Sequence, residues 1–310
     1  MKRNTAIWLA GTVAVCAAAT VPAFWLKEIQ HGAPFATSAR QPRLPKRLSP
    51  ADYQTEQDAR FTVRLREAER NRAMSSLDAH LIKPLMDDVR TRTLAVEGLE
   101  VTTEQFPELL ATVKSCGRIL HLARLPRVFI SEGATLPIIT DNYSEPVLII
   151  QPGLLNRFRE PAELRFLIGR ELGHLQAGHV RWQTLLRQAK KLTARIVPFS
   201  NANTFPALLP LFYWARECEM TADNAGFICA QDIGTAERVL VQLAAGIDES
   251  SSGRINVAAY LRQAQTEKLS QASEGVLFWK ELSAPVPFAP ERIRQLRQYQ
   301  SSDRYRAVWE

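Results

Sequence analysis

Cysteine is scarce in this chain of 310 residues, which contains only 4. Cys16 lies in an apolar N-terminal segment, and Cys116, Cys218 and Cys229 form no C-x-x-C pair. This spacing argues against a cysteine-based zinc knuckle and against the disulfide framework of a small secreted domain. One disulfide and three buried thiols are both compatible with the sequence.

Most of the chain also lacks net charge. The formal net charge is +7, but residues 1–50 hold seven Lys and Arg residues and a single acid, Glu28, a net charge of +6. The remaining residues therefore carry only about +1. A nucleic-acid-binding domain needs a basic face, so we expect no nucleic-acid partner. A basic segment beside a membrane, in contact with anionic lipid, fits the charge distribution better.

Charge is absent altogether from residues 5–26, which follow Lys2 and Arg3. A transmembrane helix needs about 20 apolar residues, so we expect residues 1–26 to be a single-pass membrane anchor. Trp25 is typical of the membrane interface. A cleavable signal peptide, which would release a secreted protein, is the alternative. We expect the folded domain on the outer side, periplasmic or extracellular.

The chain then divides into three parts. Residues 27–50 are rich in Pro and Arg without periodicity, which is typical of a linker. Residues 51–100 are expected to form a helical extension, which Ser49 and Pro50 begin as N-cap and first helical residue. Residues 101–310 are expected to form the main folded domain.

The main domain is expected to be α+β and mostly helical, with a small sheet. Thr103 is a candidate cap for a first helix. Two short β-branched segments, 127–131 and 146–151, are bounded by turn residues and predict strands. Apolar periodicity predicts further helices at about 161–179, 181–195, 206–231, 234–246, 254–265 and 290–299.

The predicted helix over 161–179 contains the sequence Arg170-Glu171-Leu172-Gly173-His174. In the motif H-E-x-x-H, two His residues on one helix face share a zinc ion, and the Glu acts as general base on zinc-bound water. Here Glu171 and His174 are in register, but Arg170 stands at the first His position. Alone, a Glu three residues before a His on a helix occurs often by chance and is more typical of a surface pair than of a functional site.

A second acidic element follows on the predicted helix over 206–231. Glu219 and Asp223 are four residues apart and share one helix face. Two like charges at this spacing are mildly destabilising on a solvated face. A cation between the two carboxylates would explain why both are there.

These elements together resemble the HtpX-like and CAAX-prenyl-protease-type zinc metallopeptidases, peptidase family M48. The resemblance covers about residues 104–296 and implies a gluzincin-like zincin fold. It implies zinc ligands at position 170, His174 and Glu219, with Glu171 as general base and Asp223 beside the ligands. The ordered motifs are Pro107-Glu108-Leu109, RVFIS, VLII, Gly153-Leu154-Leu155, Glu163-Leu164, FLIGRELGHLQAGH, Arg216 to Asp223 and Pro290-Glu291-Arg292-Ile293.

The chain departs from this family at three places. A guanidinium has only donors and is always protonated, so Arg170 cannot bind zinc. Val286 stands where the family has a His, and residues 136–140 do not match the family's Asn-Ala segment. No other histidine replaces the ligand. His179 is expected about 140° around the helix from His174, His121 is expected to be structural, His80 lies outside the matched region and His31 is in the linker.

We therefore expect zinc to be absent or weakly bound. The hypothesis is that Arg170 replaces the metal as the cation of the site and pairs with Glu219 and Asp223. Three functions remain open. The first is a membrane-anchored pseudo-protease that binds a protein or peptide in its cleft without cutting it. The second is an active zinc endopeptidase with an unusual site, and the third is a purely structural component.

Overall fold

The computed structural model describes residues 41–69, 89–134, 136–141, 145–187, 205–247, 253–266 and 286–310. The predicted anchor, residues 27–40 of the linker, His31, His80 and the helix start expected at Pro84 lie outside these ranges. Among the described residues, no helix is both long enough and apolar enough to cross a membrane.

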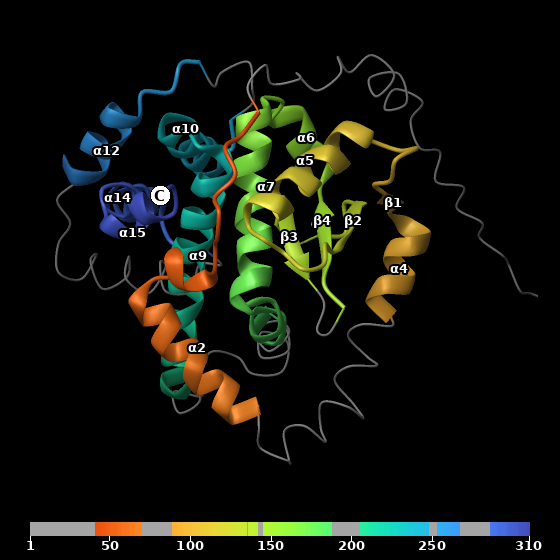
Figure 1. Ribbon diagram of the computed structural model, residues 1–310, viewed down its shortest axis with the longest axis horizontal. Helices are drawn as coiled ribbons and strands as arrows, with labels where there is room; N and C mark the ends of the chain where they lie inside the picture. The colour runs from red at the N-terminus through yellow and green to blue at the C-terminus, as the bar shows by residue number, and fades with distance from the viewer. Residues whose placement is uncertain are drawn as a thin grey trace, which may run out of the picture. The chain divides into compact units, whose positions relative to one another are not determined.

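The N-terminal segment begins with a capped turn, as predicted. Ser49 caps the short 3-10 helix η1 (Pro50–Asp52), and both its N–H and its hydroxyl donate to the Asp52 carboxylate, at 2.7 and 2.9 Å. Helix α2 (Glu56–Glu69) and helix α4 (Val89–Glu97) follow. Figure 1 shows the segment before α2 running alongside α9.

Four short strands form one sheet within the described residues, in the order β1-β2-β4-β3. Strands β2 (Arg127–Ile130) and β4 (Val147–Ile150) are parallel neighbours and confirm the two predicted strands. Strands β1 (Leu99–Glu100) and β3 (Ile138–Asp141) pair antiparallel on either side and were not predicted. With only 2 residues, β1 shows no readable period.

The helices follow the sequence prediction closely. They are α5 (Pro107–Ile119), α6 (Pro152–Arg157), α7 (Pro161–Ala177), α9 (Phe205–Ala230), α10 (Ile233–Ala245), α12 (Val257–Thr266), α14 (Ala289–Gln300) and α15 (Asp303–Ala307). Only α6 and α15 were not anticipated. The helix predicted from residue 181 is helical as far as residue 187, beyond which the next residues lie outside the description. The domain is thus α+β and mostly helical.

The predicted cap at Thr103 was wrong. Helix α5 begins at Pro107, after Phe106 with a positive φ of 58°. The hydroxyl of Thr102 instead accepts hydrogen bonds from the backbone N–H groups of Glu104 and Gln105, at 3.2 and 3.1 Å. Such local side-chain bonds offer the backbone an alternative to the helix, so the turn delays the helix start.

Helices α7 and α9 lie side by side through the centre of the domain and approach closely through glycines (Figure 1). A Cβ atom at Gly173 would lie 2.4 Å from the Cβ of Ala225, and one at Gly226 would lie 2.6 Å from the carbonyl oxygen of Phe166. No larger residue fits at these contacts. The close approach brings the predicted site residues of the two helices together.

The three cysteines in the described residues, Cys116, Cys218 and Cys229, are buried and unpaired in disulfides. Of the two alternatives that the sequence left open, the structure therefore shows three buried thiols. Cys116 and Cys229 belong to the main apolar core, which also contains residues of α5, α7, α9 and α14.

Candidate functional site

Arg170 lies between the two carboxylates that the sequence placed on one helix face. Its Nη2 atom is 2.6 Å from Glu219 Oε2, and its Nε atom is 2.5 Å from Asp223 Oδ1. Only 5% of Arg170 and 7% of Glu219 are exposed. The predicted pairing of Arg170 with both acids is therefore present, and it is buried.

A second guanidinium completes this ion network. Arg292, on α14, donates from Nε to Asp223 Oδ2 at 2.8 Å and from Nη2 to Asp223 Oδ1 at 2.7 Å. The family resemblance placed Asp223 beside the metal ligands, and in the structure it contacts the guanidinium groups of Arg170 and Arg292. Two cations now face two anions, which is the balance that buried charges require.

The electrostatics of the network favour the charged forms. Burial acts to lower the pKa of Arg170, but Asp223 and Glu219 outweigh burial and raise this pKa above its ordinary value. Burial acts to raise the pKa of Glu219, but His174, Arg170 and Arg292 outweigh it and leave this pKa well below its ordinary value. The guanidinium and the carboxylate therefore hold each other ionised.

Glu171, at the general-base position of the family, contacts the edge of the sheet. Its Oε2 atom accepts the Thr140 N–H at 2.6 Å, and the Thr140 hydroxyl donates to the Glu171 carbonyl at 3.1 Å. Burial raises the pKa of Glu171, against the opposing effect of His174 and Arg170. This contact could not be predicted, because residues 136–140 matched nothing in the family pattern. They run into strand β3.

Both backbone polar groups of Thr140, its N–H and its carbonyl oxygen, form hydrogen bonds with side chains of the chain itself. Its N–H is taken by Glu171, and its carbonyl oxygen accepts from Arg187 Nη2 at 3.4 Å. Arg187 is also held by Asp141 and Thr184, each at 2.9 Å. Among the described strands β3 is an edge strand, and an added strand needs free backbone groups at such an edge. At Thr140 this edge therefore has no free backbone group to pair with an added strand, and we call it a closed edge.

His174 contacts a second histidine. The Nδ1 atoms of His174 and His179 are 3.0 Å apart, and His174 Nε2 lies 3.5 Å from Glu219 Oε1. The prediction that His179 lies 140° around the helix was wrong, because α7 ends at Ala177. Gly178 then adopts a positive φ of 82° and turns the chain back.

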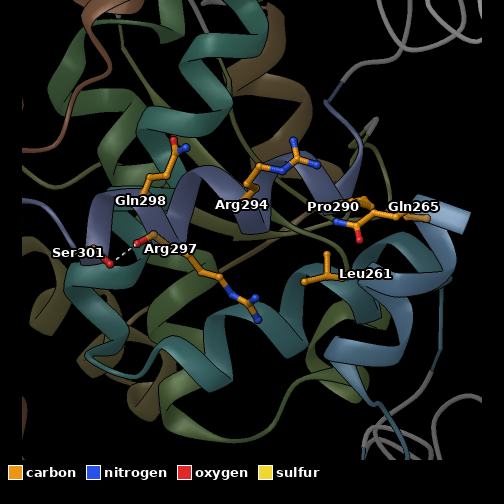
Figure 2. Close-up of a pocket in the computed structure, with 8 residues that line it drawn as sticks. Leu261, Gln265, Pro290, Arg294, Arg297, Gln298 and Ser301 are labelled. Atoms are coloured by element: carbon orange, nitrogen blue, oxygen red, sulfur yellow. Dashed lines mark hydrogen bonds between the residues drawn. The ribbon is translucent and has the colours of Figure 1, made fainter.

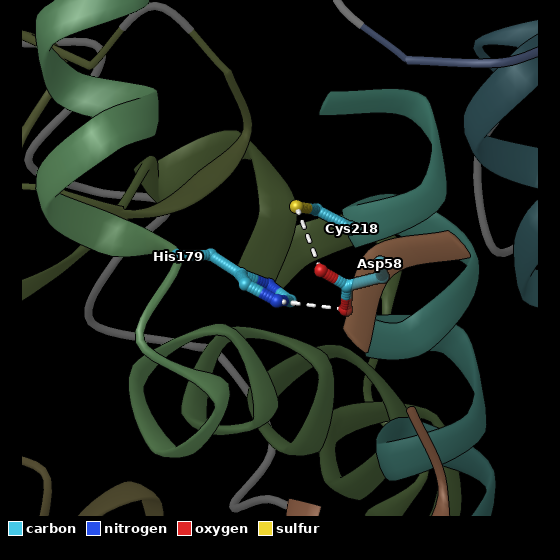
Figure 3. Close-up of side chains that lie close together, drawn as sticks. All are labelled: Asp58, His179 and Cys218. Carbon is cyan, nitrogen blue, oxygen red and sulfur yellow. Dashed lines mark hydrogen bonds and ion pairs between the residues drawn. The ribbon is translucent and has the colours of Figure 1, made fainter. Parts of the chain in front are cut away.

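His179 in turn contacts a buried carboxylate of helix α2. Its Nε2 atom is 2.9 Å from Asp58 Oδ2, and neither side chain is exposed (Figure 3). Asp58 also accepts from the Thr221 hydroxyl at 2.7 Å, and from the Thr62 hydroxyl and the Trp214 indole at 3.0 Å each. Sequence reasoning missed Asp58, since nothing local distinguishes it from other acids of α2.

Asp58, His179 and Cys218 lie close enough together to suggest a metal site (Figure 3). The hydrogen bonds argue otherwise. Four good donors point at the two oxygens of Asp58, and a carboxylate has about four lone-pair positions. The Cys218 thiol is only a distant neighbour, 3.8 Å from Oδ1. The carboxylate is therefore satisfied without a metal.

Two surface pockets were found away from these residues. One, of about 440 Å³, lies between α12 and α14 and is lined by Leu261 and Arg294 among others (Figure 2). The other, of about 800 Å³, lies along α5 and is lined by Lys114 and Leu125 among others. Neither is lined by Arg170, Glu171, His174, Glu219 or Asp223.

The comparison with known protein families decides the assignment. A sequence model described as "Peptidase family M48" matches residues 144–300, about half of the chain. The chain belongs to peptidase family M48. The matched residues contain the whole ion network, whereas Asp58 and Thr140 lie before them.

One curated M48 relative is a plastoglobule-localized metallopeptidase 48 of Arabidopsis thaliana, described as chloroplastic. It is 27% identical to this chain over 281 residues, which are 86% of this chain and 77% of the relative. No solved structure matched.

M48 peptidases depend on zinc, but the residues at the M48 metal position do not fit it. A catalytic zinc takes three protein ligands, and Arg170 has no lone pair to offer. Its guanidinium also donates to Glu219 Oε2 at 2.6 Å, so a cation already neutralises the carboxylate that would bind the metal. We therefore derive no catalytic step through zinc.

The lowered pKa of Asp58 leads us to expect that the free energy of unfolding falls in acid. Burial acts to raise its pKa, but hydrogen bonds from His179 and Thr221 outweigh burial and leave the pKa well below its ordinary value. A carboxyl group with a lowered folded pKa stabilises the fold above its unfolded pKa of about 3.9 and ceases to do so as the pH falls.

Between pH 5 and pH 3, the free energy of unfolding should thus fall more steeply for the wild type than for Asp58→Asn. Urea unfolding at several pH values measures this. Equal slopes would show that the pKa of Asp58 is not lowered in the folded protein.

Proposed function

We propose that this M48 protein is a pseudo-protease, which holds a protein or peptide partner without cleaving it. The observation that carries the proposal is the buried contact of Arg170 with Glu219 and Asp223. A permanent positive charge at the metal position repels a divalent cation and also uses the carboxylate that would bind it. Family membership supports a peptidase-like fold, and the loss of cleavage is inferred from this one position.

The test restores the ligand. The wild type and an Arg170→His variant are purified with zinc present, and bound zinc is measured by elemental analysis. The wild type is expected to hold almost no zinc, and the variant about one per chain, because an imidazole at position 170 completes a set of three ligands with His174 and Glu219.

An Arg170→Gln variant is the matched control. It removes the positive charge without adding a strong ligand, so it should stay almost free of zinc. Casein cleavage is measured for the same proteins. One zinc per wild-type chain, or casein cleavage by the wild type, would favour the alternative of an active zinc endopeptidase with an unusual site.

A purely structural role is the second candidate, and the closed edge of β3 favours it. Glu171 and Arg187 occupy the backbone groups of Thr140, and 6% or less of Arg170, Glu171 and His174 is exposed. Fluorescence anisotropy with labelled, unfolded casein separates the two. Saturable binding by the wild type supports the pseudo-protease, and its absence supports the structural component.

We also propose that residues 5–26 anchor the protein in a membrane, with the domain on the outer side. The support is the uncharged length of this segment, which suffices to span a bilayer. After expression, a carbonate wash should leave the chain in the membrane pellet, and external protease should digest the domain in intact cells. A soluble chain shortened at its N-terminus would support the signal-peptide alternative.

A further inference from the structure

The surface pocket of about 800 Å³ along helix α5, from here on the α5 groove, takes no part in the functions described above. Its apolar lining comes from Ala111, Leu122 and Leu125 and, from a distant part of the chain, Leu44. A Cβ atom at Gly117 would lie 2.3 Å from Cδ2 of Leu125, so this leucine lies directly on the helix backbone. The volume is within the usual range of about 300–1,000 Å³ for sites that bind small molecules.

Leu44 is held in place on both sides, although 52% of it is exposed. Before it, the Arg43 N–H donates to Gln231 Oε1 at 2.9 Å, and Gln231 Nε2 donates to the Arg43 carbonyl oxygen at 2.6 Å. After it, the carbonyl oxygen of Pro45 accepts from Nε2 of His121, which also lines the groove, at 3.0 Å. The groove therefore exists before any ligand binds, with an exposed apolar side chain fixed in its wall.

Two cations line the same groove. Lys114 and Arg118 are four residues apart on α5 and exposed, and neither forms an ion pair with another residue that the structure describes. Like charges at this spacing are mildly destabilising by themselves. None of the residues that line the groove is acidic. Positive charge beside exposed apolar surface matches a molecule that has an anionic head and an apolar tail.

The position of Leu44 in the chain favours a membrane lipid over a soluble partner. Fewer than 20 residues separate Leu44 from residue 26, where the proposed membrane anchor ends. Even when fully extended, so short a segment spans at most roughly 65 Å. With the anchor in a bilayer, the lipids of that bilayer are therefore always close to the groove, whereas a soluble partner must first be encountered.

We propose that the α5 groove binds an anionic phospholipid of the membrane in which the protein is anchored. The acyl chain lies against Leu44 and Leu125, and the phosphate lies between Lys114 and Arg118. The proposal rests on the membrane anchor proposed above, and it is independent of whether the protein cleaves peptides. It adds a second contact with the membrane, made by the folded domain itself.

Photocrosslinking to lipids tests the proposal on the full-length protein. The protein is reconstituted in nanodiscs of phosphatidylcholine with some phosphatidylglycerol, and the phosphatidylglycerol carries a diazirine on its acyl chain. After illumination and digestion with chymotrypsin, mass spectrometry identifies the crosslinked peptides. We expect crosslinks at Leu44 and within residues 111–125. With the diazirine on phosphatidylcholine instead, their yield should be about fivefold lower or less, whereas residues 5–26 should crosslink to both lipids.

A double variant with Lys114→Glu and Arg118→Glu should lower the yield at the groove roughly tenfold or more, because two attractive charges become repulsive. The crosslinks within residues 5–26 should be unchanged. The matched control is Arg254→Glu with Arg262→Glu, which makes the same change of charge at two exposed cations in and beside α12. It should keep the wild-type yield at the groove.

The result for the wild type decides between the two membrane proposals. Crosslinks within residues 5–26 but none at the groove would overturn the lipid site and leave an acidic protein segment as the occupant that fits. Equal yields at the groove from both lipids, or an equal loss in the α12 control, would also overturn it. Missing crosslinks within residues 5–26 would instead contradict the anchor.

Discussion

Replacing Arg170 with Met is expected to lower the free energy of unfolding by about 3–5 kcal/mol, the usual effect of removing one partner from a buried ion pair. Glu219 would lose its closest cation while remaining buried, and Asp223 would keep only Arg292. Urea unfolding of both proteins under the same conditions measures the difference.

The control is Arg127→Met, at an ion pair with similar geometry on the surface. Arg127 donates two hydrogen bonds of 2.8 Å to Glu100, but the two side chains are 47% and 37% exposed. Exposed pairs contribute about 0–1 kcal/mol, so this variant should be nearly as stable as the wild type. If Arg170→Met had an equally small effect, the buried network would not be an important support of the fold.

The second large effect is expected from Gly226→Ala in helix α9. The new Cβ atom would lie 2.6 Å from the carbonyl oxygen of Phe166 and 2.6 Å from Cγ of Arg170. The backbone of α7 cannot yield as a flexible side chain does, so the two helices must separate. Overpacking of this kind destabilises a protein by about 1–3 kcal/mol.

Gly153→Ala in α6 is the matched control, since a Cβ atom there meets nothing within 4 Å. Alanine is the better helix former by up to about 1 kcal/mol, so this variant should be unchanged or slightly more stable. Urea unfolding measures both glycine variants. A Gly226→Ala protein as stable as the wild type would mean that α7 and α9 are not in such close contact.

The part of the site that lies on two helices could be predicted from the sequence. Helical spacing places Glu219 and Asp223 on one face, and the family pattern aligns Arg170 with a metal ligand. Because a guanidinium is always charged and a buried charge needs an opposite charge beside it, pairing of Arg170 with the two acids was the expected arrangement. The mostly helical α+β fold was predictable for the same reason, because long apolar periodicities are the clearest signals in a sequence.

The contacts made by distant segments could not be predicted. Arg292 lies 69 residues after Asp223. The spacing of residues along the sequence does not predict that two side chains so far apart come into contact. His179 reaches His174 only because Gly178 turns the chain. Asp58 and Thr140 come from short or polar segments without a pattern. Each depends on tertiary packing rather than on local sequence.

The central claim is that a guanidinium occupies the metal position of this M48 domain. Its most direct test is a crystal structure of the wild-type protein grown with excess zinc, with diffraction recorded at the zinc absorption edge. We expect electron density for the Arg170 guanidinium between Glu219 and Asp223 and no anomalous peak beside His174 Nε2. An anomalous peak shared by His174 and Glu219, with Arg170 turned away, would contradict the account.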